Sequence, residues 1–541
     1  MYQDGRQFEI RRVSSILVGI VVALLLVACV ATTPPASQVI DHPPDPGAAR
    51  RAGGPLPGLS AAQLELFEAG KDAFNEIDTV KGSAESSAGL GPRFNLNSCG
   101  GCHGFPASGG SSGFVNPEPI VAKLEGARND APIPFLHADG PIVEARFKVL
   151  MAANGTLLRQ PDGGVHALFT IAGRTDAAGC DIAQPGFERA WNSDNVTLRI
   201  PTPVFGLGLI EAISEATIKA NSLETLQTVA NATKDHDASN GLKTMSHSDE
   251  YWGVAKSGDM ATMYRQLGIV GRPGRGRENR SGNDSTITRF GWKAQNKSLL
   301  LFAGEAYNVE QGVTNELFPN ERDEEATVPL PAACQVNATP EDDTKLAATA
   351  NAPDARHELR SAPLTGDFTK VAGDLVKFEL FMRMLAPPLP ACDMGRSGSC
   401  ADNIIRGSQV FDDIYCAACH VRQLKLGPSS IPAITAQRFA HLYSDLLLHK
   451  MGVCAPNANH TARCLADGIS QGQAQADEFR TAPLWGAGQR VFFLHDGRAR
   501  DLPTAILAHR GPGSEANVVI KLYEKLPDTS KQDLIDFLRS L

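Results

Sequence analysis

Cys99-Gly-Gly-Cys102-His103 recurs later in this chain of 541 residues as Cys416-Ala-Ala-Cys419-His420. The shared pattern, Cys-x-x-Cys-His, is the attachment site of a c-type haem. The two thiols capture the vinyl groups of the porphyrin, and the histidine reaches the iron. A Cys-x-x-Cys pair alone would also suit a redox dithiol or half of a zinc site. Because histidine follows in both copies, the sequence predicts two covalent haems with His103 and His420 as proximal iron ligands.

The N-terminal segment has the pattern of an export signal. Arg11 and Arg12 precede an apolar run that ends at Ala28, and Cys29 follows at the expected cleavage site. This resembles a bacterial lipoprotein signal, whose cysteine is diacylated and becomes the mature N-terminus. An uncleaved anchor is the alternative, but the run is shorter than the roughly 20 residues that span a bilayer. We therefore expect residues 1–28 to be a signal peptide and Cys29 to be the lipidation site.

The same segment indicates the compartment. Val30, and not aspartate, follows Cys29, which favours the periplasmic side of the outer membrane of a Gram-negative bacterium over the inner membrane. Haem attachment to Cys-x-x-Cys-His also takes place outside the cytoplasm. Two independent signals therefore agree on export, with a lipid membrane as one partner.

Cysteine usage suits an oxidising compartment. The chain has 11 cysteines, and Cys29 and the four haem cysteines leave an even remainder. Short spacings favour two of the pairs and leave a third across a long loop, although other pairings and free buried thiols are alternatives. The expected disulfides are Cys392–Cys400, Cys454–Cys464 and Cys180–Cys334.

Composition excludes one class of partner and leaves room for several domains. The net charge is −9, and no basic arm or basic-plus-aromatic stripe indicates nucleic acid. Residues 29–59 are rich in Pro, Ala and Gly and are typical of a flexible tether. Pro387-Pro388-Leu389-Pro390 marks a boundary between two further units, which we expect at residues 60–388 and 389–541.

An internal repeat organises these two units. Each haem motif follows a helix candidate with Gly-x-x-x-Phe, and each unit continues with a Pro/Gly turn and ends in an amphipathic helix. The segments are Gly70–Phe74, Pro203–Gly208 and Asp374–Phe378, then Gly407–Phe411, Pro483–Gly488 and Asp533–Phe537. This order is typical of a cytochrome c domain. We expect a mainly α fold of two tandem cytochrome c-like haem domains, the first enlarged by long, loop-rich insertions around 105–200 and 215–285.

The first helix candidate carries its own start signal. Ser60 and Gln63 have capping-box spacing. Leu64, Phe67, Phe74 and Ile77 follow at helical spacing and are expected on one face.

Several segments resemble one protein family. Phe493-Leu-His495-Asp496-Gly497-Arg498-Ala499 resembles the C-terminal haem domain of the di-haem cytochrome c peroxidase and MauG superfamily. Further segments are similar to the bacterial di-haem oxidoreductase, or thiol-oxidoreductase-like, family within it: 200–212, 289–294, 312–319, 445–452 and 502–509. The resemblance covers roughly residues 60–541. It implies the architecture and redox chemistry better than a substrate.

The resemblance implies a sixth ligand for the second haem. The superfamily takes it from the helix after Asp-Gly-Arg, where peroxidases place methionine and this chain has His509. Nitrogen in place of a thioether should lower the reduction potential. His449 and Met451 are rival ligands, and a surface role for His509 is the alternative.

The resemblance also implies a catalytic group at the first haem. The peroxidase family places a catalytic Glu at a fixed interval after a Trp, and the same interval from Phe290 reaches Glu310. A carboxyl in a dry pocket suits proton relay in peroxide chemistry, because its pKa rises towards neutrality. A solvated Glu at a helix end is the alternative.

Two neighbours of Phe290 complete this implied site. Phe290 stands where the family has its electron-relay Trp and is far harder to oxidise, so Trp292 is the substitute relay; core packing is the alternative for either ring. Lys293 stands at a family Arg and is expected to hold an anionic group or a haem propionate.

Weaker candidates complete the set. His166 and Arg174 resemble residues of family members, but loop and surface roles are the simpler interpretations. His495 is expected to stabilise a turn or contact a propionate. An interdomain calcium ion is a further candidate, with Thr481 and Pro483 as ligands.

Two functions remain open. In the first, the protein is a peroxidase-like oxidoreductase, with haem 2 as electron port and haem 1 as catalytic site. A small-molecule oxidant or reductant and a small periplasmic cytochrome or cupredoxin would be its partners. In the second, it is a pure electron carrier whose haems are both six-coordinate. Thiol oxidation rests on the family label alone.

Overall fold

The computed structural model describes residues 39–42, 51–83, 87–120, 133–152, 154–222, 264–275, 287–322, 330–343, 373–453 and 465–541. The expected signal peptide, Cys29 and the Cys454–Cys464 pair lie outside these residues. Within them, no helix combines the length and the apolar character needed to cross a membrane.

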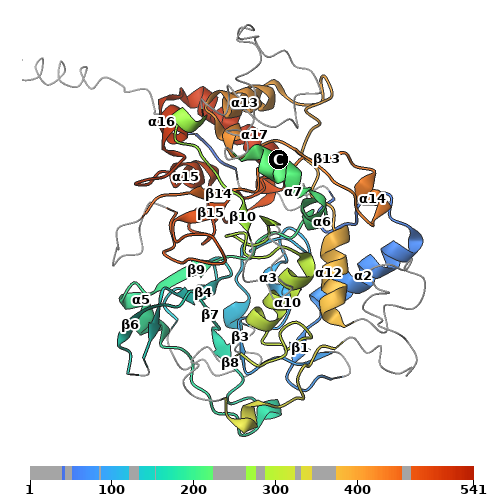
Figure 1. Ribbon diagram of the computed structural model, residues 1–541, viewed down its shortest axis with the longest axis vertical. Coiled ribbons are helices and arrows are strands. Elements are labelled where there is room, and N and C mark those ends of the chain that lie inside the picture. Colours follow the sequence, from blue (N-terminus) through green and yellow to red (C-terminus); the bar gives the residue numbers. More distant parts are fainter. Residues whose placement is uncertain are drawn as a thin grey trace, which may run out of the picture.

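Each half of the chain is built on a pair of packed helices (Figure 1). Helix α2 (Ala61–Asn75) packs on α12 (Asp374–Met384), and α13 (Asp402–Asp413) packs on α17 (Asp528–Ser540). A Cβ atom on Gly70 would lie 2.5 Å from the carbonyl oxygen of Lys377, and one on Gly407 would lie 1.9 Å from that of Asp533. Only glycine fits at these distances, so the two repeated glycines mark the two helix contacts.

The phenylalanine of each repeat connects its helix pair to the haem motif. The ring centroid of Phe74 lies 6.0 Å from that of His103, and the ring centroid of Phe411 lies 6.5 Å from that of His420. Both phenylalanines are buried. In both halves, therefore, the repeated phenylalanine lies next to the histidine of the haem motif.

Helix α2 begins where the sequence predicts but buries a different face. Ser60 and Gln63 form the expected capping box. Leu64 is 39% exposed, and Ile77 lies beyond the helix and is 50% exposed, so neither shares the buried face of Phe67 and Phe74. The buried face instead includes Gly70, because that glycine is the point of contact with α12.

A Pro/Gly turn in each half rests on the end of the closing helix. Gly206 precedes α6 (Leu207–Ala212) with φ 68°, and Gly486 precedes η8 (Ala487–Gln489) with φ 72°. Glycine adopts this left-handed conformation without strain. The amide of Gly206 donates to the carbonyl oxygen of Leu385 at 3.1 Å, and that of Gly486 donates to Leu541 at 2.8 Å.

The insertion after the first haem motif contains strands, which makes the fold mixed. Strand β4 (Glu144–Phe147) pairs antiparallel with β7 (Val165–His166) and β9 (Val196–Arg199) in the order β7-β4-β9. In Figure 1 these strands lie on the other side of α10 (Leu299–Glu310) from α2 and α12. The expected mainly helical fold describes the two helix pairs and omits this sheet.

Short elements make up the rest of the described chain. In the first half they are β1 (Asp78–Thr79), β2 (Ser87–Ala88), β3 (Arg93–Phe94), α3 (Cys99–Cys102), β5 (Val149–Met151), β6 (Leu157–Pro161), β8 (Phe169–Thr170), η2 (Thr175–Ala177), α5 (Phe187–Asn192), α7 (Glu215–Asn221), β10 (Gly274–Arg275), β11 (Ile287–Thr288) and η5 (Ala332–Cys334). In the second half they are η7 (Cys416–Ala418), β12 (Leu424–Lys425), α14 (Pro432–Thr435), β13 (Phe439–Ala440), β14 (Leu448–Lys450), β15 (Glu478–Arg480), α15 (Leu502–Leu507) and α16 (Asn517–Lys525).

The two halves share hydrophobic cores. Leu442 and Leu446 from the second half belong to the cluster that contains Phe74, and Phe479 belongs to the cluster that contains Phe147. Buried apolar area stabilises a fold by roughly 25 cal/mol per Å². The halves therefore stabilise each other and place their haem motifs in one packed body.

A buried ion group also joins the halves. The carboxylate of Asp467 lies 2.7 Å from Arg199 Nη2 and 3.0 Å from Lys293 Nζ, and all three side chains are at most 2% exposed. Burial opposes ionisation of Asp467, but the two cations outweigh it and lower the pKa of Asp467 to about 2. Asp467 is therefore ionised near neutral pH, while burial lowers the pKa of Lys293 to about 8, which leaves that ammonium mostly charged.

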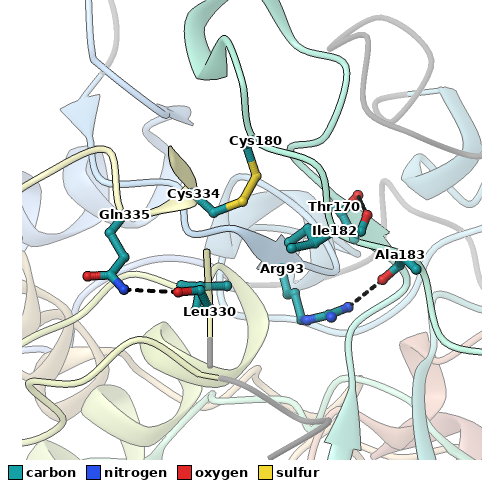
Figure 2. Close-up of a disulfide and its surroundings, with 8 residues drawn as sticks. All are labelled: Arg93, Thr170, Cys180, Ile182, Ala183, Leu330, Cys334 and Gln335. Atoms are coloured by element: carbon teal, nitrogen blue, oxygen red, sulfur yellow. Dashed lines mark hydrogen bonds between the residues drawn. A yellow bond between two sulfur atoms is a disulfide. The ribbon is translucent and has the colours of Figure 1, made fainter. Parts of the chain in front are cut away.

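Two of the three expected disulfides are present among the described residues. Cys180 is bonded to Cys334 and Cys392 to Cys400. Figure 2 shows that the first bond joins the segment after η2 to η5, next to Arg93. It links positions 154 residues apart, so it restricts the unfolded chain strongly.

Candidate haem sites

Two cavities in the described part of the chain each contain one haem motif. Cavity 1 is lined by Cys99, Cys102 and His103 among others. Cavity 2 is lined by Cys416, Cys419 and His420 among others. Each Cys-x-x-Cys-His motif therefore opens into its own cavity, as a haem attached to its cysteines would require.

The proximal histidines are prepared for metal binding in the same way. Nδ1 of His103 lies 3.1 Å from the carbonyl oxygen of Gly110, and Nδ1 of His420 lies 3.0 Å from that of Tyr443. A carbonyl oxygen can only accept, so Nδ1 carries the proton and Nε2 is the nitrogen that can ligate iron. Burial lowers the pKa of each imidazole to about 4, so both are neutral near pH 7.

Unpartnered buried polar atoms indicate that both cavities fit a ligand with carboxylates. Arg490 and His495 line cavity 2, and Nε and Nη2 of Arg490 and Nε2 of His495 are buried without a hydrogen-bond partner. Nε of Arg199, which lines cavity 1, is also unpartnered. Such atoms are costly unless an acceptor satisfies them, and haem propionates would supply carboxylate oxygens at these guanidinium groups.

Cavity 2 has a second available imidazole. His509 follows α15 and lines the cavity, and its Nδ1 donates to the carbonyl oxygen of Ala505 at 2.8 Å, which leaves Nε2 as its ligating nitrogen. His449 also lines the cavity, but its Nε2 lies 3.1 Å from Asp445 Oδ2 and its Nδ1 lies 2.8 Å from Glu515 Oε2. Both ring nitrogens of His449 are therefore hydrogen-bonded to carboxylates. His509 and the thioether of Met451 remain candidates for the sixth iron ligand.

Cavity 1 has a carboxyl group at the predicted position. Glu310, the last residue of α10, lines this cavity, and its Oε2 accepts a hydrogen bond from Asn95 Nδ2 at 2.6 Å. Burial raises the pKa of Glu310 well above its usual range, and the nearby charge of Glu144 and a hydrogen bond with it raise it further. These effects favour the protonated form of Glu310, which is partly buried at the cavity and hydrogen-bonded to Asn95.

The remaining lining of cavity 1 differs from that of cavity 2. Among the described residues around cavity 1, His103 is the only imidazole and Met382 of α12 the only thioether. Glu118 also lines it, and burial raises the pKa of that carboxyl to about 8. The cavity thus combines one histidine with acidic groups that hold protons.

Trp292 lies between the two cavities. Its side chain lines both of them, and its Nε1 donates to the carbonyl oxygen of Ile200 at 3.0 Å. Phe290 lines neither cavity; it packs in the core against Phe302, with ring centroids 6.1 Å apart. Of the two predicted relay residues, only Trp292 has the position for that role.

Lys293 does not reach either cavity. Its Nζ lies 3.0 Å from Asp467 Oδ1, donates to the carbonyl oxygens of Gln475 and Glu478 at 3.1 and 3.0 Å, and lies over the ring of Phe479. Its side chain is fully buried. Lys293 therefore holds an anionic group, the carboxylate of Asp467, in an ion group that joins the halves. It lines neither cavity, so its position gives no support to a catalytic or propionate-binding role.

The weaker candidates have structural roles. Nε2 of His166 lies 2.9 Å from Asp162 Oδ2, and its ring stacks on Phe147; it lines neither cavity. Arg174 pairs with Asp176 at 2.8 Å. His495 stacks on Phe479 with centroids 4.5 Å apart and lines cavity 2, as a propionate contact would.

The calcium candidates gain no support from their surroundings. The carbonyl oxygen of Thr481 accepts from Ser444 Oγ at 2.6 Å and from Arg480 Nη1 at 3.3 Å. Pro483 lines cavity 2. Within the described ranges, no three His, Cys, Asp or Glu residues group as metal ligands would.

Sequence reasoning missed three residues of cavity 1: Glu118, Glu144 and Arg146. They come from the insertion, where periodicity is weak. Glu144 and Arg146 alternate along β4, so that both face the cavity. The sequence signal that could have identified Glu144 and Arg146 is a pair of opposite charges two residues apart in an otherwise apolar stretch.

One comparison with known proteins, a family model, agrees with these sites. Residues 279–541 match the model of the family described as "Di-haem oxidoreductase, putative peroxidase". Among solved structures, a hydrazine synthase of Kuenenia stuttgartiensis is similar at 20% identity with a TM-score of 0.20, a likeness too weak to indicate a shared fold. That alignment covers 31% of this chain and 55% of the other, so the chain spans about half of that protein's length. No curated protein matches the chain.

The family description agrees with a chain that has two haem motifs, each in its own cavity. It also fits the acid in cavity 1, since peroxidase chemistry needs a proton donor. Residues 279–541, slightly less than half of this chain, are thus similar to the di-haem oxidoreductase family.

Proposed function

We propose that this protein is an exported, lipid-anchored di-haem c-type cytochrome that reduces a peroxide at haem 1 and receives electrons through haem 2. One observation carries the proposal: the two cavities differ in what accompanies the proximal histidine. Cavity 2 has a second imidazole, His509, whereas the described lining of cavity 1 has none and has Glu310 instead. Two nitrogen ligands suit electron transfer, and an open position suits chemistry.

Within this proposal the motif cysteines hold each haem covalently and His103 and His420 ligate the irons. Bound haem would supply the site at which a peroxide binds and accepts electrons. Reduction of one hydrogen peroxide takes two electrons and two protons and releases two water molecules. Glu310 is the group that delivers a proton to the departing oxygen, because it is a partly buried acid with a raised pKa.

Electrons would reach cavity 1 through Trp292. Its indole is the aromatic side chain shared by both cavities, and Arg490 lies over the ring, with the guanidinium carbon 5.9 Å from the centroid. A small periplasmic cytochrome or cupredoxin would supply electrons to haem 2 one at a time. The lipid on Cys29 would keep the enzyme at the periplasmic face of the outer membrane.

A pure electron carrier is the second candidate, because one residue favours it. The thioether of Met382 lines cavity 1 and would make haem 1 six-coordinate if it reached the iron. Met382 belongs to α12, whose partner helix α2 carries Phe74 against His103. Helix α12 thus lies on the same side of cavity 1 as the proximal His103. This position of Met382 favours the peroxidase over the pure electron carrier.

The substitution Glu310→Gln tests the proposed function. With its haems in place, the variant should lose about 10²- to 10⁴-fold in kcat for hydrogen peroxide, which is the usual contribution of a general acid. The matched control is Glu321→Gln, which alters a partly buried Glu that has a raised pKa and lines neither cavity. Turnover would be followed by oxidation of a reduced small cytochrome. Equal turnover in E310Q and wild type would contradict a catalytic role of this acid.

A further inference from the structure

We infer that Glu144 and Glu310 act as one proton-sharing carboxyl pair in cavity 1, in which Arg146 holds the charge on Glu144 and thereby keeps the proton on Glu310. This inference rests on the proposed function, which it deepens by adding a second carboxyl to the acid. Glu144 is a positioning residue in this scheme. Glu310 is the residue that meets the substrate.

The surroundings of Glu310 fix its orientation. The amide N–H of Leu168 donates to Asn95 Oδ1 at 2.8 Å, so the side-chain nitrogen of Asn95 must point the other way. That nitrogen donates to Glu310 Oε2 at 2.6 Å, and the backbone of Asn95 also donates to the carbonyl oxygen of Glu310 at 2.7 Å. Because Asn95 donates to one carboxyl oxygen, the proton of Glu310 belongs on the other, where it can be given to Glu144.

Glu144 is held from a separate element, the central strand β4. Its Oε1 lies 2.5 Å from Nε of Arg146, and Nη1 of Arg146 donates to the carbonyl oxygen of Gly163 at 2.9 Å. Glu144 pairs in register with Arg199 of β9, which adds a second cation. The hydrogen bond between Glu144 and Glu310 thus connects β4 to the end of α10.

Charge decides which carboxyl holds the proton. Burial disfavours ionisation of both, and two adjacent carboxyls cannot both ionise at low cost. Arg146, the hydrogen bond with Glu310 and then Arg199 lower the pKa of Glu144 against the effect of burial. Other ionisable groups around the cavity include His103, Glu118, Glu305 and, behind Arg199, Asp467, which is already paired with Arg199 and Lys293. The pair therefore carries one proton and one negative charge near pH 7.

A pair in this state can do what a single protonated Glu cannot. Neutral Glu310 has a proton to give but no charge with which to take one. The pair can accept the proton that a hydroperoxide loses on binding, which takes its charge from −1 to 0. It then returns that proton to the oxygen that leaves as water when the O–O bond breaks, and its charge is again −1. The electrons come from the haems in the proposed function.

Infrared spectroscopy of the full-length protein with its haems tests the pair without any measurement of turnover. A protonated carboxyl group has a C=O stretching band that shifts in D₂O. We expect wild type at pH 7 to have such a band that Glu310→Gln removes. Glu144→Gln should remove the same band, because Arg146 without its partner makes Glu310 the ionised acid. Glu144→Asp keeps the charge and should keep the band.

Controls separate this result from general disturbance of the protein. Glu321→Gln should remove a different band, because Glu321 is also partly buried with a raised pKa but lies outside both cavities. In turnover, E144Q should lose about 10²-fold in kcat, at the low end for general acid–base groups. As the pH rises, the turnover rate that remains in E144Q should decrease at a lower pH than the turnover rate of E144D does.

Two results would overturn the inference, and neither is the failure of the proposed function. The first is an E144Q protein whose Glu310 band is unchanged. The second is an E144Q pH profile that coincides with that of E144D. If instead E310Q turns over peroxide like wild type while both variants lose the band, the pair exists and the proposed function is wrong.

Discussion

At the scale of single residues, the two cavities differ most in the groups that share them with the proximal histidine. His509 and His420 line cavity 2 together, and each donates its Nδ1 proton to a backbone carbonyl. Cavity 1 offers Glu310 in place of a second imidazole. Two predictions test these residues one at a time.

The first prediction concerns the sixth ligand of haem 2. His509→Met should raise the reduction potential of that haem and leave the other unchanged, because thioether ligation favours the reduced iron. A spectroscopic redox titration measures both potentials. His137→Met, at an exposed residue that lines neither cavity, is the control. Unchanged potentials in H509M would point to Met451 instead.

The second prediction concerns the electron route. Trp292→Phe should slow electron transfer between the haems several-fold and leave both haem spectra unchanged, because phenylalanine is far harder to oxidise than tryptophan. Stopped-flow absorbance after mixing with a reduced donor gives the rate. Phe290→Leu should leave the rate unchanged, and it should lower the free energy of unfolding by about 1–2 kcal/mol as a core substitution. A slower rate in F290L than in W292F would contradict this assignment.

At the scale of elements, both haem motifs depend on a helix pair that meets at a glycine. Gly407→Ala should destabilise the protein by about 3 kcal/mol or more, because its Cβ would lie 1.9 Å from the backbone oxygen of Asp533. Gly186→Ala is the matched control, since its Cβ would meet nothing within 4 Å. Denaturant unfolding measures both. Equal stability of the two variants would mean that α13 and α17 do not meet as described.

Local sequence signals predicted the helices that hold the haem motifs. The features that they did not predict depend on tertiary contacts. The capping box at Ser60 and the glycine repeat specify a helix start and a helix contact from neighbouring residues alone. The strand β4 was missed because its short apolar stretch has no clear period, and Glu144 was missed with it. The role of Lys293 depends on Asp467, which is distant in the sequence, so a family position was a poor guide.

At the scale of the whole molecule, the charged group of Arg199, Asp467 and Lys293 joins the halves and should make their stability depend on pH. The pKa of Asp467 is lowered in the folded state from 3.8 to about 2. Its contribution, about 2 kcal/mol, is therefore complete above about pH 4 and is lost as the pH falls towards 2. Urea unfolding between pH 2 and pH 5 should show this loss.

The variant Asp467→Asn isolates that contribution. It should be less stable than wild type at pH 7, because two buried cations lose their counter-charge. Below pH 4, its free energy of unfolding should also lack the part of the decrease that protonation of Asp467 causes in wild type. Parallel pH curves for wild type and D467N would contradict the assignment of this decrease to the interface.

The account depends on two irons with unlike axial positions in one chain. Electron paramagnetic resonance of the fully oxidised protein, carrying both haems, measures this directly. We predict one high-spin ferric signal from haem 1 and one low-spin signal, of the type given by two imidazole ligands, from haem 2. Two low-spin signals that azide and cyanide leave unchanged would contradict it.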